Sequence, residues 1–114
     1  MPHFILDCSE NILELQKPRE VLEEVLETAY ATGLFEKNDI KVRLNPFKHS
    51  LVQGSDDDFI HVFANIMEGR NTEQKSNLSK QIVAKLKSMF PSTPIISINI
   101  RDFEKASYCN KKML

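Results

Sequence analysis

The sequence has 114 residues, 41% of them hydrophobic and 27% charged, which is typical of a globular protein and predicts one domain spanning residues 1–114. The formal net charge of −1 argues against nucleic-acid binding, and no apolar run reaches the ~20 residues that span a bilayer. The N-terminus lacks the basic start of a secretory signal and two cysteines do not form a disulfide framework, so we expect a cytoplasmic protein.

The first part of the chain predicts a strand, a helix and a second strand. Residues 2–8 are apolar, aromatic and β-branched, which is typical of a strand. Residues 18–32 place apolar side chains on one helical face and glutamates on the other, with Pro18 suited to the first turn. Gly33 suits the position just past the helix end. Residues 39–44 alternate apolar and basic side chains, as a half-buried strand does.

The second part repeats this pattern after a loop. Residues 45–58 form the loop, with room for a short hairpin, and the apolar residues 59–67 predict a more deeply buried strand. Asn71 or Thr72 can cap a second helix, which two prolines end. Residues 95–100 predict the last strand, and the remaining tail is polar and weakly specified.

The two halves predict the same architectural unit used twice. The spacing from Pro2 to Asp39 equals the spacing from Asp58 to Ile95. A crossover of a dozen or more residues makes the two strands of each β-α-β unit parallel, with a right-handed connection. We therefore predict an α+β fold, a four-stranded mixed sheet with two helices on one face. The other face would be bare, so we expect it to pack against further copies of the chain.

Pro2 is the first candidate for chemistry, because methionine aminopeptidase removes Met1 when a small residue follows. The new chain start would be a secondary amine. A free α-amino group has a pKa of about 7.7–8.0, and both burial and nearby cations lower it. A neutral amine near pH 7 is a competent general base. The alternative is that Pro2 only opens a strand, where proline is tolerated.

Cations are expected around Pro2. The parallel crossover puts the start of the second strand beside the start of the first, so Lys41 and Arg43 would point to one face near Pro2. If the second unit is antiparallel to the first, Arg70 also approaches, just before a helix N-terminus that favours anions. Together these cations would bind a dicarboxylate and lower the pKa of the amine. Taken singly, Arg43 also fits a solvated strand residue and Arg70 a loop charge.

Metal and thiol chemistry are not expected. His3, His49 and His61 show no recognised zinc spacing with either cysteine, so we predict no metal site. Cys8, at a strand end, fits a small buried hydrophobic residue better than a nucleophile.

Four stretches carry a resemblance to a known family, namely PHFILDCSENI, ATGLF, IKVR and FIHVFANIMEGRN. The sequence resembles the 5-carboxymethyl-2-hydroxymuconate isomerase family of the tautomerase superfamily, up to about Arg101, and is least similar in the loop and the tail. The resemblance implies a homotrimer of β-α-β repeats with a catalytic N-terminal proline, which matches Pro2. It also implies arginines that bind substrate carboxylates, matched by Arg43 and Arg70. At Lys41 we would expect a further arginine.

The resemblance implies a Delta-isomerase that needs no metal or organic cofactor. Neutral Pro2 would take the 2-hydroxyl proton of a hydroxymuconate dienol, while Arg43, Arg70 and Lys41 hold its carboxylates. Protonated Pro2 would then return the proton to carbon at the far end of the conjugated system. Two alternatives remain: a tautomerase of another 2-oxo acid, of phenylpyruvate or oxalocrotonate type, and a non-catalytic trimeric interaction protein.

Overall fold

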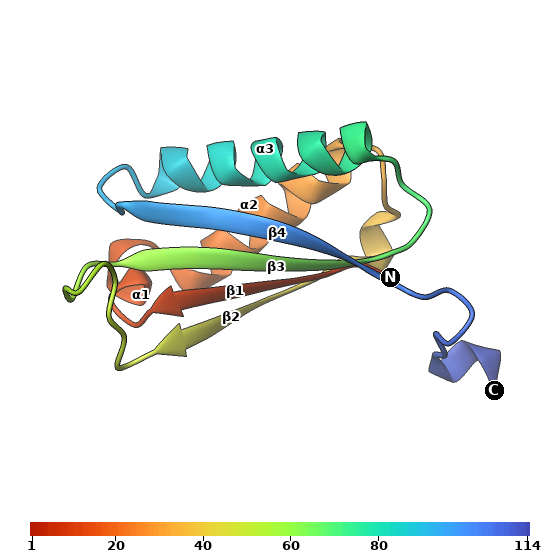
Figure 1. Ribbon diagram of the computed structural model, residues 1–114, viewed down its shortest axis with the longest axis horizontal. Coiled ribbons are helices and arrows are strands. Elements are labelled where there is room, and N and C mark those ends of the chain that lie inside the picture. The colour runs from red at the N-terminus through yellow and green to blue at the C-terminus, as the bar shows by residue number, and fades with distance from the viewer.

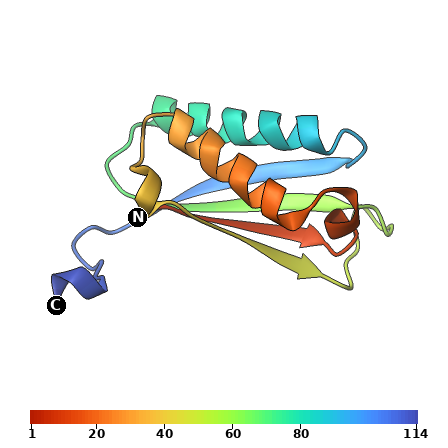
Figure 2. The same ribbon diagram turned by 180° about the vertical axis from the view of Figure 1, so that it is seen from behind.

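The computed structural model describes all 114 residues as two layers, a single sheet with helices packed on one of its faces (Figures 1 and 2). The strands are β1 (His3–Ser9), β2 (Lys41–Phe47), β3 (Phe59–Met67) and β4 (Ile95–Phe103). The helices are α1 (Ile12–Leu15), α2 (Pro18–Ala31) and α3 (Thr72–Met89), with 3₁₀ turns η1 (Lys37–Asp39) and η2 (Lys111–Met113). The predicted α+β architecture, with both long helices on one face, is confirmed.

The sheet is mixed, as predicted, with strand order β2-β1-β3-β4. Strands β1 and β2 are parallel, β3 and β4 are parallel, and the central pair β1 and β3 is antiparallel. In this register His3 lies opposite both Lys41 and Asn65. The first residues of β1 and β2 therefore lie at the same end of the sheet as the last residues of β3 and β4.

The core lies between the sheet and the two long helices, because side chains of a strand alternate between its faces. Phe4, Leu6 and Cys8 of β1 are fully buried, and α2 and α3 cover this face. Their partners in the core include Ile60, Val62, Ala64 and Ile66 of β3, Val21, Val25 and Ala29 of α2, and Leu78, Ile82 and Leu86 of α3.

Local signals fix the ends of the helices. Pro18 stands in the first turn of α2, and Gly33, just past its end, has a φ of 78°. Asn71 caps α3 in a capping box, since its side chain accepts from the Gln74 amide and the Gln74 side chain accepts from the Asn71 amide. Of the two predicted caps, Asn71 is therefore the one used. Gly69 has a φ of 123°, which side chains rarely tolerate, and it turns the chain between β3 and α3.

Strands β2 and β4 run further toward the C-terminus than predicted, and β2 begins at Lys41 because η1 occupies the predicted start at Asp39. Strand β2 continues past Leu44 to Phe47, because β1 also extends and pairs Ser9 with Phe47. Proline is tolerated at Pro46 because β2 is an edge strand. The predicted hairpin in the loop is a tight turn in which Val52 and Ser55 exchange backbone hydrogen bonds of 2.9 Å. The short helix α1 was not predicted from the sequence.

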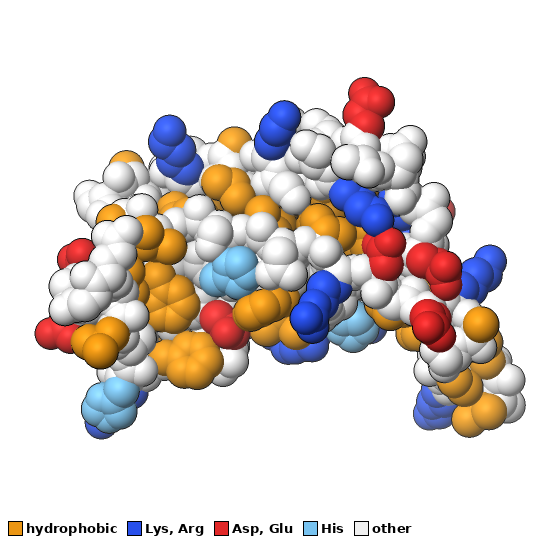
Figure 3. Space-filling view, viewed as in Figure 1, with side chains coloured by type: hydrophobic (Ala, Val, Ile, Leu, Met, Phe, Trp, Pro, Cys, Tyr) orange, Lys and Arg blue, Asp and Glu red, His pale blue; other side chains and the backbone are white.

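The second face of the sheet, here called the outer face, has no helix over it (Figure 3). Alternate strand residues form it, from His3, Ile5 and Asp7 through Lys41, Arg43 and Asn45 to Phe59, His61, Phe63, Asn65, Ser97, Asn99 and Arg101. His61 is bonded on this face through Nδ1 to Ser97 Oγ and through Nε2 to Asn99 Oδ1, each at 2.6 Å. The face thus mixes apolar and satisfied polar groups.

The tail leaves the globule at the end of the sheet where the chain begins (Figure 1). Tyr108 stacks on Phe103 with ring centroids 5.3 Å apart, and the Lys105 amide donates to Glu68 Oε2. Beyond these contacts it ends in exposed Met113 and Leu114. As to membranes, none of the helices combines the length and the apolar character that a bilayer crossing requires.

The capping box predicts a measurable loss on substitution. Asn71→Ala should lower the free energy of unfolding by about 1 kcal/mol, because the Gln74 amide at the start of α3 loses its partner. The matched control is Asn77→Ala, on the exposed side of the same helix, which should change it by less than about 0.5 kcal/mol. Urea unfolding at one protein concentration compares them, and equal values for the two variants would contradict the capping role.

Candidate active site

A small cavity of about 200 Å³ lies at the beginning of the chain. Three segments meet there: the chain start, the loop from α2 to β2, and the residue before α3. The lining residues are Met1, Pro2, Gly33, Leu34, Phe35, Glu36, Asp39 and Arg70. We call this the chain-start cavity. The antiparallel pairing of β1 with β3 brings Pro2 and Arg70 to it from distant parts of the sequence.

Arg70 is held firmly in this cavity. Its Nη1 donates to the Met67 carbonyl at 3.1 Å and its Nη2 to the Leu34 carbonyl at 2.6 Å. The guanidinium carbon also lies 5.0 Å from the centroid of the Phe35 ring, within cation–π range. A guanidinium has five N–H donors, so these two bonds orient the group and leave donors for an anion.

The start of the chain is an amine in an unusual environment. Burial lowers the pKa of the Met1 amine below its ordinary value of 8.0; Asp39 opposes this, and Lys41 and Arg70 lower it further. Pro2 itself is buried, and its carbonyl accepts from the Lys41 amide at 3.1 Å. Removal of Met1 would move the amine onto this buried residue. The site therefore favours the neutral, basic form of a terminal amine.

Lys41 and Arg43 share one face of β2, as predicted, but it is the outer face and not the face of Pro2. Strand alternation places Pro2 on the helix side with Phe4, and pairs His3 with Lys41 on the other side. Lys41 stays near the chain start, with its Nζ donating to the Asp39 carbonyl at 2.8 Å and lying 3.9 Å from Met1 Sδ. Arg43 does not line the chain-start cavity and instead contacts His3.

The loop between α2 and β2 adds residues that the sequence did not single out. Phe35 supports Arg70, while Glu36 and Asp39 bring two carboxylates to the cavity rim. The available signal was topological, because the connection into a parallel strand must pass the start of the first strand. Within one chain the cavity thus holds one guanidinium and two carboxylates, and a polyanion would need the cations of the outer face as well.

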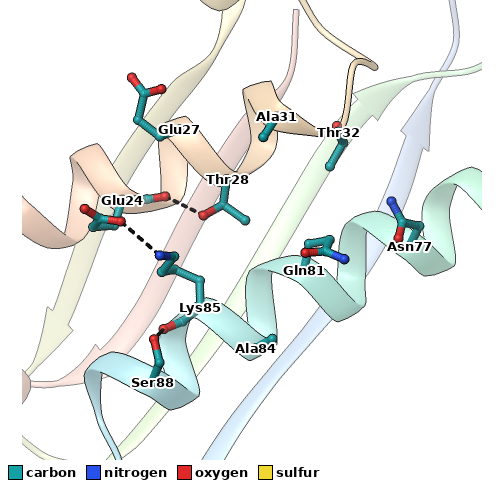
Figure 4. Close-up of a pocket in the computed structure, with 10 residues that line it drawn as sticks. All are labelled: Glu24, Glu27, Thr28, Ala31, Thr32, Asn77, Gln81, Ala84, Lys85 and Ser88. Atoms are coloured by element: carbon teal, nitrogen blue, oxygen red, sulfur yellow. Dashed lines mark hydrogen bonds and ion pairs between the residues drawn. The ribbon is translucent and has the colours of Figure 1, made fainter.

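A larger hollow of the surface lies elsewhere, between α2 and α3 (Figure 4). It measures about 720 Å³, and several of its polar groups are already engaged. Lys85 pairs with Glu24 at 3.3 Å, and the hydroxyls of Thr28 and Ser88 donate to carbonyls of their own helices. The groove lies between two packed helices, away from the start of the chain.

Thiols and metal ligands do not form a competing centre. Cys8 is fully buried in the core, as predicted, and burial raises the pKa of its thiol to about 11. No three His, Cys, Asp or Glu side chains come together in a way that would hold a metal ion.

The chain shares its fold with solved structures of a 5-carboxymethyl-2-hydroxymuconate isomerase and of a fused 4-OT. A crystal structure of a 5-carboxymethyl-2-hydroxymuconate isomerase from Deinococcus radiodurans R1 superposes with a TM-score of 0.83 at 24% identity, covering 96% of this chain and 88% of that one. A fused 4-OT, solved as a symmetric trimer, superposes with a TM-score of 0.83 at 17% identity over 98% of this chain and 95% of its own.

Sequence comparison identifies the family. The family model described as 5-carboxymethyl-2-hydroxymuconate isomerase matches residues 2–112, and the chain therefore belongs to this enzyme family. It is also 28% identical over 92 residues to the 5-carboxymethyl-2-hydroxymuconate Delta-isomerase of Escherichia coli, covering 79% of this chain and 73% of that relative. The family resemblance drawn from the sequence is confirmed.

The electrostatics of the cavity can be tested directly. Arg70→Gln should raise the pKa of the terminal amine, because it removes a cation that disfavours protonation. Arg43→Gln is the matched control and should leave the pKa unchanged, since Arg43 is not among the groups that shift it. Labelling of the amine with an amine-reactive reagent across pH, read by mass spectrometry, measures both. A shift of the same size in both variants would contradict the role given to Arg70.

Proposed function

We propose that the chain is an isomerase whose N-terminal proline moves a proton on a hydroxymuconate-type dienol dicarboxylate, such as 5-carboxymethyl-2-hydroxymuconate. Met1 is removed, and the nitrogen of Pro2 becomes the general acid and base. In its neutral form it takes the proton of the substrate's 2-hydroxyl. Once protonated, it gives that proton to carbon at the far end of the conjugated system, which produces the conjugated 2-oxo isomer.

The observation that carries the proposal is the meeting of Pro2 and Arg70 in one cavity. Burial lowers the pKa of the terminal amine that Met1 carries, and an amine in its neutral form is a competent general base. The oriented guanidinium of Arg70, next to the start of α3, is suited to a carboxylate or a developing dienolate. The pyrrolidine ring fixes the direction of the nitrogen, so little rotational freedom is lost.

The substrate class follows from the number and type of cations at the end of the sheet where the chain begins. Arg70 lines the chain-start cavity, while Lys41 and Arg43 lie on the outer face beside it. A substrate with two or more carboxylates can contact both groups, and we assign its second carboxylate to Lys41 and Arg43. Lysine keeps the charge but lacks the bidentate fork of arginine. Lys41 therefore binds that carboxylate less tightly than an arginine would.

A homotrimer fits the open side of the molecule. The outer face carries Ile5 and Phe63 among polar side chains, and nothing in the single chain covers it. The fused 4-OT that shares the fold was solved as a symmetric trimer. Closing three such faces against one another would bury these apolar groups and would bring each chain start close to a neighbouring subunit.

The central test exchanges the ring amine of Pro2 for a primary amine. Pro2→Ala should lower kcat at least about 100-fold on a hydroxymuconate dienol followed by ultraviolet absorbance, a loss typical of a displaced acid-base group. An extension of two residues before Pro2 turns the amine into an amide and should abolish turnover. Pro46→Ala, an exposed proline in β2, is the matched control and should keep full activity.

N-terminal mass must accompany these rates, since the mechanism requires that Met1 be absent. Full activity of the extended chain would remove the proposed base, and unchanged turnover in Pro2→Ala would show that the proline ring amine is not required. Dienol substrates with one and with two carboxylates separate the proposed activity from that of a tautomerase acting on a phenylpyruvate-type acid. A protein that turns over none of them would be the non-catalytic alternative.

The assembly makes its own prediction. Sedimentation at micromolar concentration should give the mass of three chains of 13.1 kDa, because a monomer would leave the outer face in water. Phe63→Lys places a charge at the centre of that face and should dissociate the trimer, whereas Leu51→Lys, at a side chain already 79% exposed, should not. A wild-type protein that sediments as a monomer contradicts the proposed assembly.

A further inference from the structure

We propose that His3 is a positioning residue, whose neutral ring holds the Arg43 guanidinium at the chain-start edge of the outer face, where it binds a substrate carboxylate. The inference rests on the proposed function, because it concerns the second carboxylate of that substrate. His3 was otherwise considered only as a metal ligand, and its spacing from the cysteines argued against that role.

The contact between His3 and Arg43 requires one protonation state of His3. Arg43 Nη1 lies 3.2 Å from His3 Nδ1. A guanidinium has donors only, so Nδ1 must be the acceptor, and the ring must be neutral with its proton on Nε2. This is the one hydrogen bond that Arg43 makes within the chain, and no carboxylate pairs with it. The position of the guanidinium therefore depends on His3.

The surroundings of His3 keep it in that acceptor state. On β2 it faces Lys41 and Arg43, on β3 it faces the uncharged Asn65, and beyond Asn65 lies Arg101 of β4. Burial lowers the pKa of His3 below its ordinary value of 6.5, and Arg43, Lys41 and the terminal amine lower it further. At neutral pH the imidazole is thus neutral, and Arg43 keeps its partner.

Lowering the pH should break the hydrogen bond between His3 and Arg43. When His3 takes a proton, Nδ1 becomes a donor, and two cations then face each other at hydrogen-bond distance. Because the pKa of His3 is lowered in the folded chain, this loss occurs below pH 6.5. The same shift makes the unfolded chain bind more protons than the folded one in that window, so the free energy of unfolding also falls as the pH drops.

The test uses a ligand that binds without reacting, so that it does not depend on Pro2. The ligand is muconate, a dienedioate that lacks the 2-hydroxyl, titrated by calorimetry into the intact assembly. His3→Ala should weaken its binding about tenfold at pH 7.5, the effect of a lost hydrogen bond to a charged group. His3→Asn offers an amide oxygen in place of Nδ1 and should restore binding. Arg43→Gln should weaken it as much as His3→Ala, and the double variant no further.

The pH dependence of muconate binding separates the proposed role from a purely structural one, because a purely structural role of His3 would not change it. Wild-type binding should weaken between pH 7.5 and pH 5.5, whereas His3→Asn, which does not titrate, should lose this dependence. Substrate kinetics should show the effect of His3→Ala in KM, with kcat within about twofold. Wild-type affinity in His3→Ala, or an acid dependence that persists in His3→Asn, overturns the inference. Either result leaves the proposed function to be decided by the turnover of Pro2→Ala alone.

Discussion

The antiparallel pairing of β1 with β3 is the constraint on which the rest of the molecule depends. Each β-α-β unit alone would give two parallel strands and one helix. Joined in opposite directions, with His3 opposite Asn65, they bring the start of the chain to the end of β3. Arg70 follows directly after that end, where Gly69 turns the chain into α3. One register therefore creates the chain-start cavity and closes the core on the same side of the sheet.

The same pairing divides the cations of the site between two faces. Arg70 reaches the terminal amine on the helix side, held by two backbone carbonyls and the Phe35 ring. Lys41 and Arg43 stand on the outer face, one strand away from the chain start. Such a division suits an elongated anion with charges at both ends, because no single cluster has to collect every cation. Glu36 and Asp39 at the cavity rim offset part of the positive charge.

Much of the fold could be predicted from the sequence because its local signals agree with its tertiary structure. The α2 helix begins at Pro18 and ends before Gly33, and Asn71 caps α3. The face that Pro2 occupies was harder to predict. Residue alternation indicated correctly that Lys41 and Arg43 share a face, but only the register shows that Pro2 lies on the other one. The extension of β2 to Phe47 was likewise set by pairing with β1, which overrode the turn signal of Asn45 and Pro46.

The central claim is that the nitrogen of Pro2 is the base, and one measurement tests it most directly. Nuclear magnetic resonance of protein labelled with ¹⁵N-proline gives the pKa of that nitrogen, and initial rates give the pH dependence of kcat/KM in the same buffers. The acid limb of kcat/KM should follow the titration of Pro2, at a pKa below the ordinary α-amino value of about 7.7–8.0. A Pro2 nitrogen that stays protonated through the pH range of full activity would contradict this claim.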